Sequence, residues 1–169
     1  GLTSKLDYIQ ELGVNAVWML PFFPSPLRDD GYDIADYRSV NPSYGSMRDV
    51  GRLIRAAHDR GMYVIQDIVF DHCGDVWAYE KDEEKVWDNG RRYPLGFWRK
   101  ANSNGPVEGE PGPDDAIWPI ELQHPDAFKR MGRMRDVGAS RGDEAVDGDF
   151  ERMKVLDLEN RAVMTAMIH

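Results

Sequence analysis

Two mostly apolar segments place the strongest limit on what this chain can fold into. They read VNAVWMLPF (residues 14–22) and MYVIQDIVF (residues 62–70), and neither shows the polar–apolar alternation of a strand with one wet face. Such strands are typical of a parallel sheet covered on both sides. Between them, SMRDVGRLIRAAHDRG predicts a helix, because Ser46 and Asp49 form a capping-box pattern and Gly61 can end it. The strand–helix–strand order predicts an α/β fold with a right-handed crossover.

Helices are also predicted towards the two ends of the chain. Residues 3–13 have apolar side chains at helical spacing; Thr3 or Ser4 can cap the start of this helix, and Gly13 can end it. The last segment, NRAVMTAMIH (residues 160–169), has the composition of another helix.

The composition changes after the second strand. From Cys73 to about residue 153 the chain is rich in Gly, Pro, charged and aromatic residues and has no sustained period. Residues 102–115 predict a solvated loop, and HPDAFKRMGRM predicts one short helix with Pro125 in its first turn. We therefore expect an irregular insertion after the second strand.

Aromatic residues are frequent in this insertion. Most of them are expected to form a small core of its own, whereas Phe97 and Trp98 are expected to be exposed, where they could stack on sugar rings. The aromatic residues in question are Trp77, Trp87, Tyr93, Phe97, Trp98 and Trp118.

The overall charge excludes some partners. Acidic residues outnumber basic ones, 30 to 21, and the net charge of −9 argues against nucleic acid or an anionic membrane as a partner. No apolar run is long enough to span a membrane.

The single cysteine, Cys73, allows no internal disulfide. The compartment stays open, with a cytoplasmic location favoured because the fold needs no oxidising environment.

The loop after the first strand concentrates acid in DDGYDIADY (residues 29–37). Like charges this close repel each other unless solvent, a cation or hydroxyl groups take up the carboxylates. Asp29, Asp30 and Asp36 fit a solvated loop. Asp33 follows Gly31 and Tyr32, and the glycine permits close backbone approach. The loop lies at the carboxyl end of a strand, where α/β folds place functional groups.

A second polar cluster, DIVFDH, ends the second strand at residues 67–72. A period of two would place Asp67 and Asp71 on one face and His72 on the other. An aspartate in an apolar strand is costly to bury unless it is paired. Structural readings stay open for each: Asp67 as a bonded carboxylate, Asp71 as a turn or cap residue, and His72 as a satisfied polar residue at a strand end.

Together these motifs resemble a known family. The stretch WMLPFFPSPLRDDGYDIADYRSVNPSYGSMRDV, followed by DIVFDH, is similar to the α-amylase superfamily (glycoside hydrolase family 13), in particular to its trehalose synthase and α-glucosidase-like branches. The resemblance implies a (β/α)8 barrel that acts on α-glucosides or α-glucans. Residues 1–72 would be a partial barrel with about strands two and three, residues 73–158 the inserted domain B, and residues 159–169 the start of the next barrel helix.

The resemblance also implies roles for individual residues. Tyr32 would stack on the glucosyl ring in subsite −1, and Asp33 would pair there with an arginine or with sugar hydroxyls. Asp67 would support the active-site network, and His72 would bond the same sugar. Asp71 stands where the family usually has an asparagine beside a calcium site, so Ca²⁺ is the one cofactor implied, with Asp71 as its ligand.

The family's two reacting carboxylates have no counterpart in this sequence, which stops about where the fourth barrel strand should begin. We therefore expect a fragment of a retaining hydrolase or transglycosidase that works by double displacement, inactive as the isolated 169-residue stretch. One alternative is a non-catalytic carbohydrate-binding or structural half-barrel module. Another is a fragment without independent stability, because open sheet edges favour aggregation. A doubly wound α/β domain is a rival fold, but no G-x-G-x-x-G follows either strand.

Overall fold

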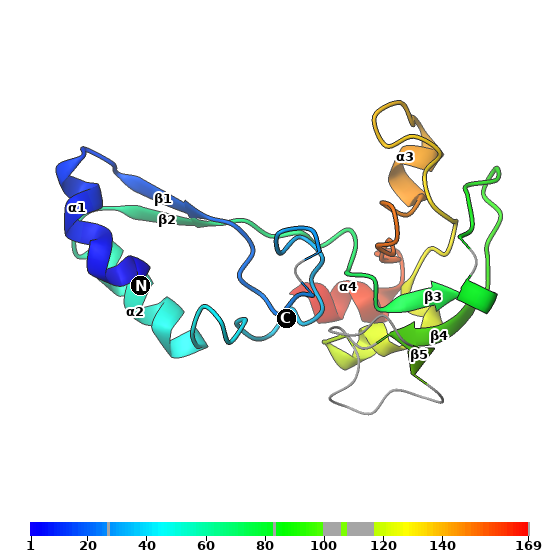
Figure 1. Cartoon of the computed structure of the whole chain (residues 1–169), viewed down its shortest axis with the longest axis horizontal. Helices are drawn as coiled ribbons and strands as arrows, with labels where there is room; N and C mark the ends of the chain where they lie inside the picture. The colour runs from blue at the N-terminus through cyan, green and yellow to red at the C-terminus, as the bar shows by residue number, and fades with distance from the viewer. Residues whose placement is uncertain (27, 83, 100–105, 108–116, 169) are drawn as a thin grey trace.

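The computed structural model describes residues 1–26, 28–82, 84–99, 106–107 and 117–168. Its elements form two groups joined by extended segments, and the molecule is elongated (Figure 1). The first group holds the first 3-10 helix, the first two α-helices and the first two strands. The second group holds the other three strands and the later helices.

The first group is a two-stranded parallel sheet with its helices. Strand β1 pairs in parallel with β2, with Val17 opposite Val64 and Trp18 opposite Ile65. The parallel pairing predicted from the sequence is therefore confirmed. The elements are the 3-10 helix η1 (Leu2–Lys5), α1 (Leu6–Glu11), β1 (Ala16–Met19), α2 (Met47–His58) and β2 (Tyr63–Gln66).

Only one face of this sheet is covered. Val17, Met19 and Val64 pack against a buried cluster from the two helices and the start of β2, made of Leu6, Leu53, Ala57 and Met62. Because side chains alternate along a strand, Trp18, Tyr63 and Ile65 point to the opposite face, where all three are exposed. The expectation of helical cover on both faces is therefore not met within the described residues.

The predicted ends of α2 are confirmed. The Asp49 backbone N–H donates to Ser46 Oγ at 3.3 Å, and the Ser46 N–H donates to Asp49 Oδ2 at 2.8 Å, which completes a capping box. Gly61 ends the helix at a φ of +69°. The predicted cap by Thr3 or Ser4 is wrong: the Ser4 hydroxyl donates to the Gly1 carbonyl at 2.8 Å, inside a 3-10 turn that precedes α1.

The second group contains a small antiparallel sheet in the order β3–β4–β5. Within the predicted solvated loop of residues 102–115, Pro106–Val107 form β5, and the rest lies outside the described residues. The short helix expected near residue 125 is a single 3-10 turn that starts at Pro125, and the final helix is confirmed as α4. The elements are β3 (Trp77–Tyr79), η2 (Glu80–Asp82), β4 (Leu95–Arg99), β5 (Pro106–Val107), η3 (Ile120–Gln123), η4 (Pro125–Ala127), α3 (Asp143–Asp147) and α4 (Arg161–Ile168).

A second hydrophobic core lies in this group. Trp77 on β3 faces Trp98 on β4 in the strand register, and both pack with Phe128, Leu156 and Val163. The expectation that Trp98 is exposed is wrong: its exposed fraction is 2%, because it lies between β3 and the later helices. The aromatic residues Trp77 and Trp98 of the insertion thus belong to a core that also includes Ala35 and Val163, from outside residues 73–158.

One carboxylate is completely buried in the second group. Asp149 Oδ2 accepts a hydrogen bond from the Tyr79 hydroxyl at 2.5 Å and lies 3.4 Å from Lys154 Nζ. The Tyr79 oxygen in turn accepts from the Gly132 N–H at 2.9 Å. A buried charge needs such partners, and burial beside Asp149 raises the pKa of Tyr79 well above its usual range.

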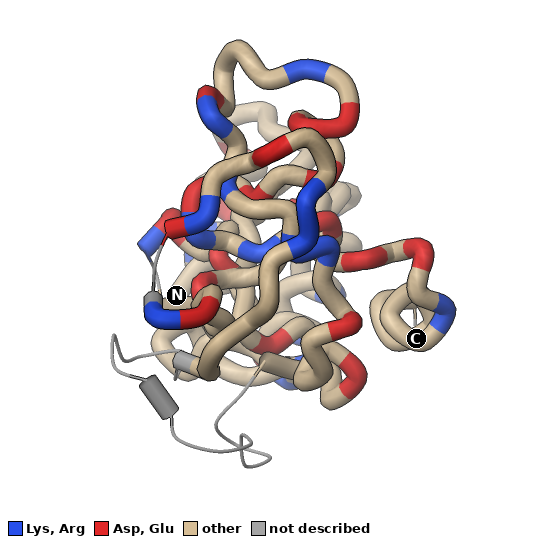
Figure 2. Tube along the Cα trace, turned by 90° about the vertical axis from the view of Figure 1, so that its right-hand side faces the viewer, with Lys and Arg blue, Asp and Glu red and all other residues tan. Residues whose placement is uncertain are grey.

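Charges of both signs are interleaved along the second group, as Figure 2 shows. In the part of the chain that the structure describes, no helix is long and apolar enough to cross a membrane.

The capping box yields a prediction for the first group. Ser46→Ala removes the hydroxyl that caps α2, so the free energy of unfolding should fall by about 1 kcal/mol in a urea titration. The pKa of Asp49, held at about 2 chiefly by the hydrogen bond from the Ser46 side chain, should rise in the same variant. Thr165→Ala, on an exposed position of α4, is the control and should change stability by less than about 0.5 kcal/mol. Equal effects of the two substitutions would contradict the capping role.

The buried Tyr79 hydroxyl yields a second prediction. Tyr79→Phe removes the hydroxyl that donates to Asp149 and leaves the buried Gly132 N–H without its acceptor, so the protein should lose about 1–3 kcal/mol of stability. Thermal unfolding followed by near-ultraviolet circular dichroism measures this loss. Tyr44→Phe makes the same chemical change at an exposed site and should leave the melting temperature unchanged. A Tyr79→Phe protein as stable as the parent would rule out a stabilising hydroxyl.

Candidate functional site

The two polar motifs meet at the carboxyl end of the parallel sheet. The Tyr32 hydroxyl donates a hydrogen bond to Asp67 Oδ2 at 3.1 Å. Asp67 follows β2 directly, and its backbone N–H donates to the Met19 carbonyl at 2.9 Å, which extends the strand pairing by one residue. Partial burial of the Tyr32 ring, together with the Asp67 carboxylate, raises the pKa of Tyr32. The structure thus brings together one predicted site residue from each motif.

The Asp33 carboxylate is turned into its own loop. Its exposed fraction is 2%, and its oxygens accept from Ser25 Oγ at 2.5 Å and from the Arg28 backbone N–H at 2.9 Å. Gly31 makes this tight loop possible, because its φ is +103° and a Cβ there would lie 2.8 Å from the Pro21 carbonyl oxygen.

The other aspartates of this loop have simpler surroundings. Asp29 and Asp30 are exposed. Asp36 is half-buried and accepts from the Arg38 N–H at 2.8 Å and from the Ser39 hydroxyl, as in an Asx turn. These positions agree with the interpretation of a loop whose extra acids shape and solvate it.

His72 is largely buried, with 14% of its side chain exposed. Its Nδ1 lies 3.1 Å from Asp71 Oδ1, and its ring stacks on Phe150. Its buried Nε2 has no hydrogen-bond partner among the residues that the structure describes. Within the described residues, no hydrogen bond joins His72 to Tyr32 or Asp67. An unpartnered buried nitrogen is costly, so it is a candidate for a bond to a ligand.

Asp71 was the residue implied as a calcium ligand. Its carboxylate is exposed, and the hydrogen bond from His72 is the main reason that its pKa is lowered. Calcium takes roughly six to eight oxygen ligands. No group of three or more histidine, cysteine or acidic side chains suited to a metal occurs among the residues that the structure describes. These residues alone therefore do not fit a calcium ion, and calcium binding stays a prediction.

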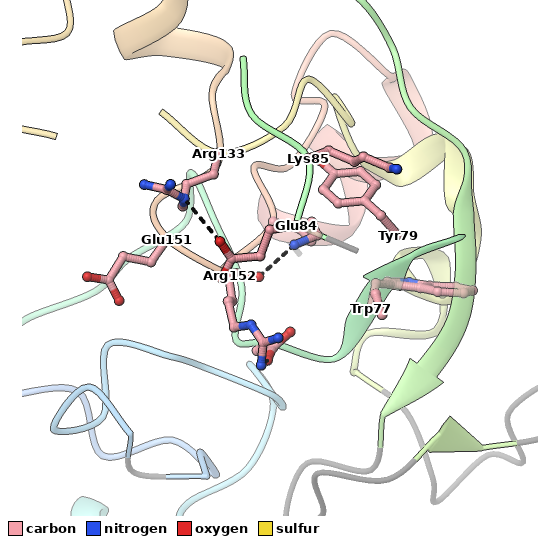
Figure 3. Close-up of a pocket in the computed structure, with 10 residues that line it drawn as sticks. Trp77, Tyr79, Glu84, Lys85, Arg133, Glu151 and Arg152 are labelled. Carbon is pink, nitrogen blue, oxygen red and sulfur yellow. Dashed lines mark hydrogen bonds and ion pairs between the residues drawn. The ribbon is translucent and has the colours of Figure 1, made fainter. Parts of the chain in front are cut away.

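Two hollows lie near the site loop, one lined in part by Asp75 and the other in part by Asp30. Figure 3 shows the smaller, about 30 Å³ in volume, where β3 meets charged side chains of both signs, including the Arg133–Glu84 pair at 3.8 Å. It has room for one or two waters and not for a sugar ring. The larger, about 990 Å³, lies between η1, the end of β1 and α2, and is reached by Asp30. Neither hollow is lined by Tyr32, Asp67 or His72.

Sequence reasoning missed three residues that organise the site. Ser25 and Arg28 bind Asp33, and the Arg28 guanidinium also lies 3.4 Å from Asp75 Oδ2. Ser25 and Arg28 lie inside the motif that carries the family resemblance, so the sequence did show residues of a suitable type there. It did not show their contacts with Asp33 and Asp75, since no spacing rule pairs Arg28 with a carboxylate far along the chain.

Comparison with known proteins places the chain in a family. Residues 1–124 match the model "Alpha amylase, catalytic domain". The oligo-1,6-glucosidase IMA5 of Saccharomyces cerevisiae is 46% identical over 99 residues, which cover 59% of this chain and 17% of that protein. An α-glucosidase of Schizosaccharomyces pombe is 38% identical over 104 residues, 62% of this chain and 18% of that protein.

A solved structure supports the fold. The α-amylase of Geobacillus thermoleovorans, complexed with acarbose, superimposes with a TM-score of 0.56 over 99% of this chain and 29% of that one, at 24% identity. The matched part of this chain spans less than a fifth of the length of each of the two glucosidases named above. Since the family model covers well over half of this sequence, the chain belongs to the α-amylase catalytic-domain family of glycoside hydrolases.

Proposed function

We propose that this chain is part of an α-glucoside-acting enzyme and supplies groups that bind the glucosyl unit in subsite −1. The names of its relatives, oligo-1,6-glucosidase and α-glucosidase, support this substrate class. The observation that carries the proposal is the Tyr32–Asp67 hydrogen bond, which joins the loops at the carboxyl ends of β1 and β2. Barrel enzymes build their active sites at that end. In the proposal β1 and β2 are the second and third strands of a (β/α)8 barrel.

Each residue has a role that its surroundings support. Asp67 holds the Tyr32 hydroxyl, so the aromatic ring keeps one orientation and offers a flat apolar face to a pyranose. The unpartnered Nε2 of His72 bonds a sugar hydroxyl. Asp33 acts through the shape of the loop, because both of its oxygens already accept hydrogen bonds.

These residues bind and orient the sugar and do not react with it. In the complete enzyme the reaction would be a double displacement, with a nucleophilic carboxylate and an acid/base carboxyl about 5 Å apart. A glucosyl ring held in one pose by Tyr32 and His72 presents its anomeric carbon to that pair in a constant geometry, which lowers the entropic part of the barrier.

The first prediction from this proposal concerns sugar binding. Isothermal titration of the 169-residue chain with maltose should detect weak binding, and Tyr32→Ala should weaken it about tenfold or more because the apolar platform is lost. Tyr32→Phe keeps the platform and should lose less. Tyr8→Ala removes an exposed tyrosine from α1 and should bind as the parent does. A Tyr32→Ala chain with the affinity of the parent would refute the role given to this ring.

The second prediction concerns the pKa of Tyr32. Asp67→Asn removes a negative charge that opposes formation of the phenolate, so the pKa of Tyr32 should fall towards the usual value of about 10. A pH titration of the tyrosine ring carbons by NMR measures it. Glu11→Gln, at the exposed end of α1, removes the same charge elsewhere and should leave this pKa unchanged. No shift in Asp67→Asn would mean that the Tyr32–Asp67 contact is absent in solution.

A further inference from the structure

The loop that carries Tyr32 is closed around one buried carboxylate. Asp33 accepts from Ser25 Oγ and from the Arg28 N–H, and the Tyr32 N–H donates to the Asp29 carbonyl at 2.8 Å. The Arg28 backbone is thus hydrogen-bonded to the residue that follows Tyr32. A movement of Arg28 would therefore shift the backbone of Tyr32.

The side chain of Arg28 leaves this loop and reaches the second group. Its Nη1 lies 3.4 Å from Asp75 Oδ2, in the segment just before β3. The Asp75 side chain is 6% exposed and that of Arg28 is 38% exposed. A carboxylate buried to this degree is costly without a cationic partner, so the contact is worth more than a pair on the open surface.

Backbone contacts lie beside this pair. The Gly74 N–H donates to the Ile34 carbonyl at 2.8 Å, and a Cβ at position 74 would lie 2.7 Å from the Asp33 carbonyl oxygen. Ala35 belongs to the hydrophobic core of the second group. The loop is thus packed against the second group, whereas the Tyr32 hydroxyl is held by Asp67 of the first group.

Asp75 also faces the inside of the second group. It is one of the residues around the small hollow of Figure 3, and Nη1 of Arg152 lies 3.9 Å from the same Asp75 oxygen that Arg28 approaches. The Asp75 carboxylate therefore stands between an arginine of the Tyr32 loop and an arginine of the second group.

We propose that Arg28 and Asp75 are positioning residues for Tyr32. Their charge pair fixes the loop against the second group, so that the packing of the second group sets the orientation of the Tyr32 ring. The inference rests on the proposed function only in taking Tyr32 as a sugar-binding residue; the coupling between the two groups stands on the contacts alone.

The test uses the full chain and variants that change one end of the pair. Arg28→Met removes the charge but keeps the backbone N–H that Asp33 accepts from, and Asp75→Asn keeps the shape of the carboxylate. Hydrogen exchange at the Arg28 and Tyr32 amides should become about fivefold faster in each variant, while the amide of Leu53 in α2 should not change. The double variant should be no faster than either single one, because both remove the same contact.

Matched variants separate charge from general damage. Arg28→Lys retains the positive charge, so hydrogen exchange at the amides of residues 28 and 32 should stay within about twofold of the parent rate. Arg52→Met breaks the exposed Arg52–Asp49 pair and should leave the loop amides unchanged.

The pKa of Tyr32 is a second readout that a general loss of stability would not move. Loosening of the loop weakens the Tyr32–Asp67 contact, so the pKa should fall in Arg28→Met. Loss of the positive charge alone would raise this pKa, so a fall cannot come from the charge itself.

The outcomes separate the inference from the proposed function. Parental exchange rates and a parental Tyr32 pKa in both Arg28→Met and Asp75→Asn would overturn the inference. Faster exchange in both variants, with about fivefold weaker maltose binding in Arg28→Met, would support it. If the loop amides respond as expected but the parent chain binds no maltose, the positioning role is supported and the proposed function fails.

Discussion

The parallel pairing of β1 with β2 is the constraint on which the candidate site depends. Parallel strands end at the same edge of a sheet, so the loop after β1 and the residues after β2 must emerge side by side. The hydrogen bond from the Asp67 N–H to the Met19 carbonyl continues this pairing past the strand ends. It puts the Asp67 carboxylate within reach of Tyr32, although 34 residues separate the two positions in the chain. The Tyr32–Asp67 contact on which the sugar-binding proposal rests therefore depends on this pairing.

A second feature is that Tyr32 is held from two sides. Its hydroxyl is bonded to Asp67 in the first group, and its backbone belongs to a loop packed against the second group through Gly74 and Asp75. The sheet itself leaves Trp18, Tyr63 and Ile65 exposed, on the face that further strands and side chains fill in a closed barrel. The described residues therefore contain a well-packed second group and a half-covered sheet, with the candidate site at their junction.

Local patterns predicted what depends on neighbours in the chain. The capping box of Ser46 and Asp49, the parallel strands and the helix at Arg161–Ile168 follow from periodicity and turn residues. Prediction failed where long-range packing decides. Trp98 is buried because β4 pairs with β3, which an irregular composition does not reveal. The predicted Ser4 cap failed for a local reason, because a 3-10 turn in which Ser4 bonds Gly1 precedes α1. Tyr32 and Asp67 could be selected from the sequence, but their direct contact, the burial of Asp33 and the link from Arg28 to Asp75 could not.

The amino-acid sequence by itself determined the α/β class, the order of the first four elements, the two acidic motifs at strand ends and the family. These rest on two continuous apolar runs, on the helical period of 3.6 residues and on a motif long enough to be specific. Only the tertiary structure decided which carboxylates face the site and which hold the backbone. Asp33 and Asp67 are chemically identical groups, and one closes a loop while the other binds a tyrosine hydroxyl, because the donors around each come from distant segments brought close by packing.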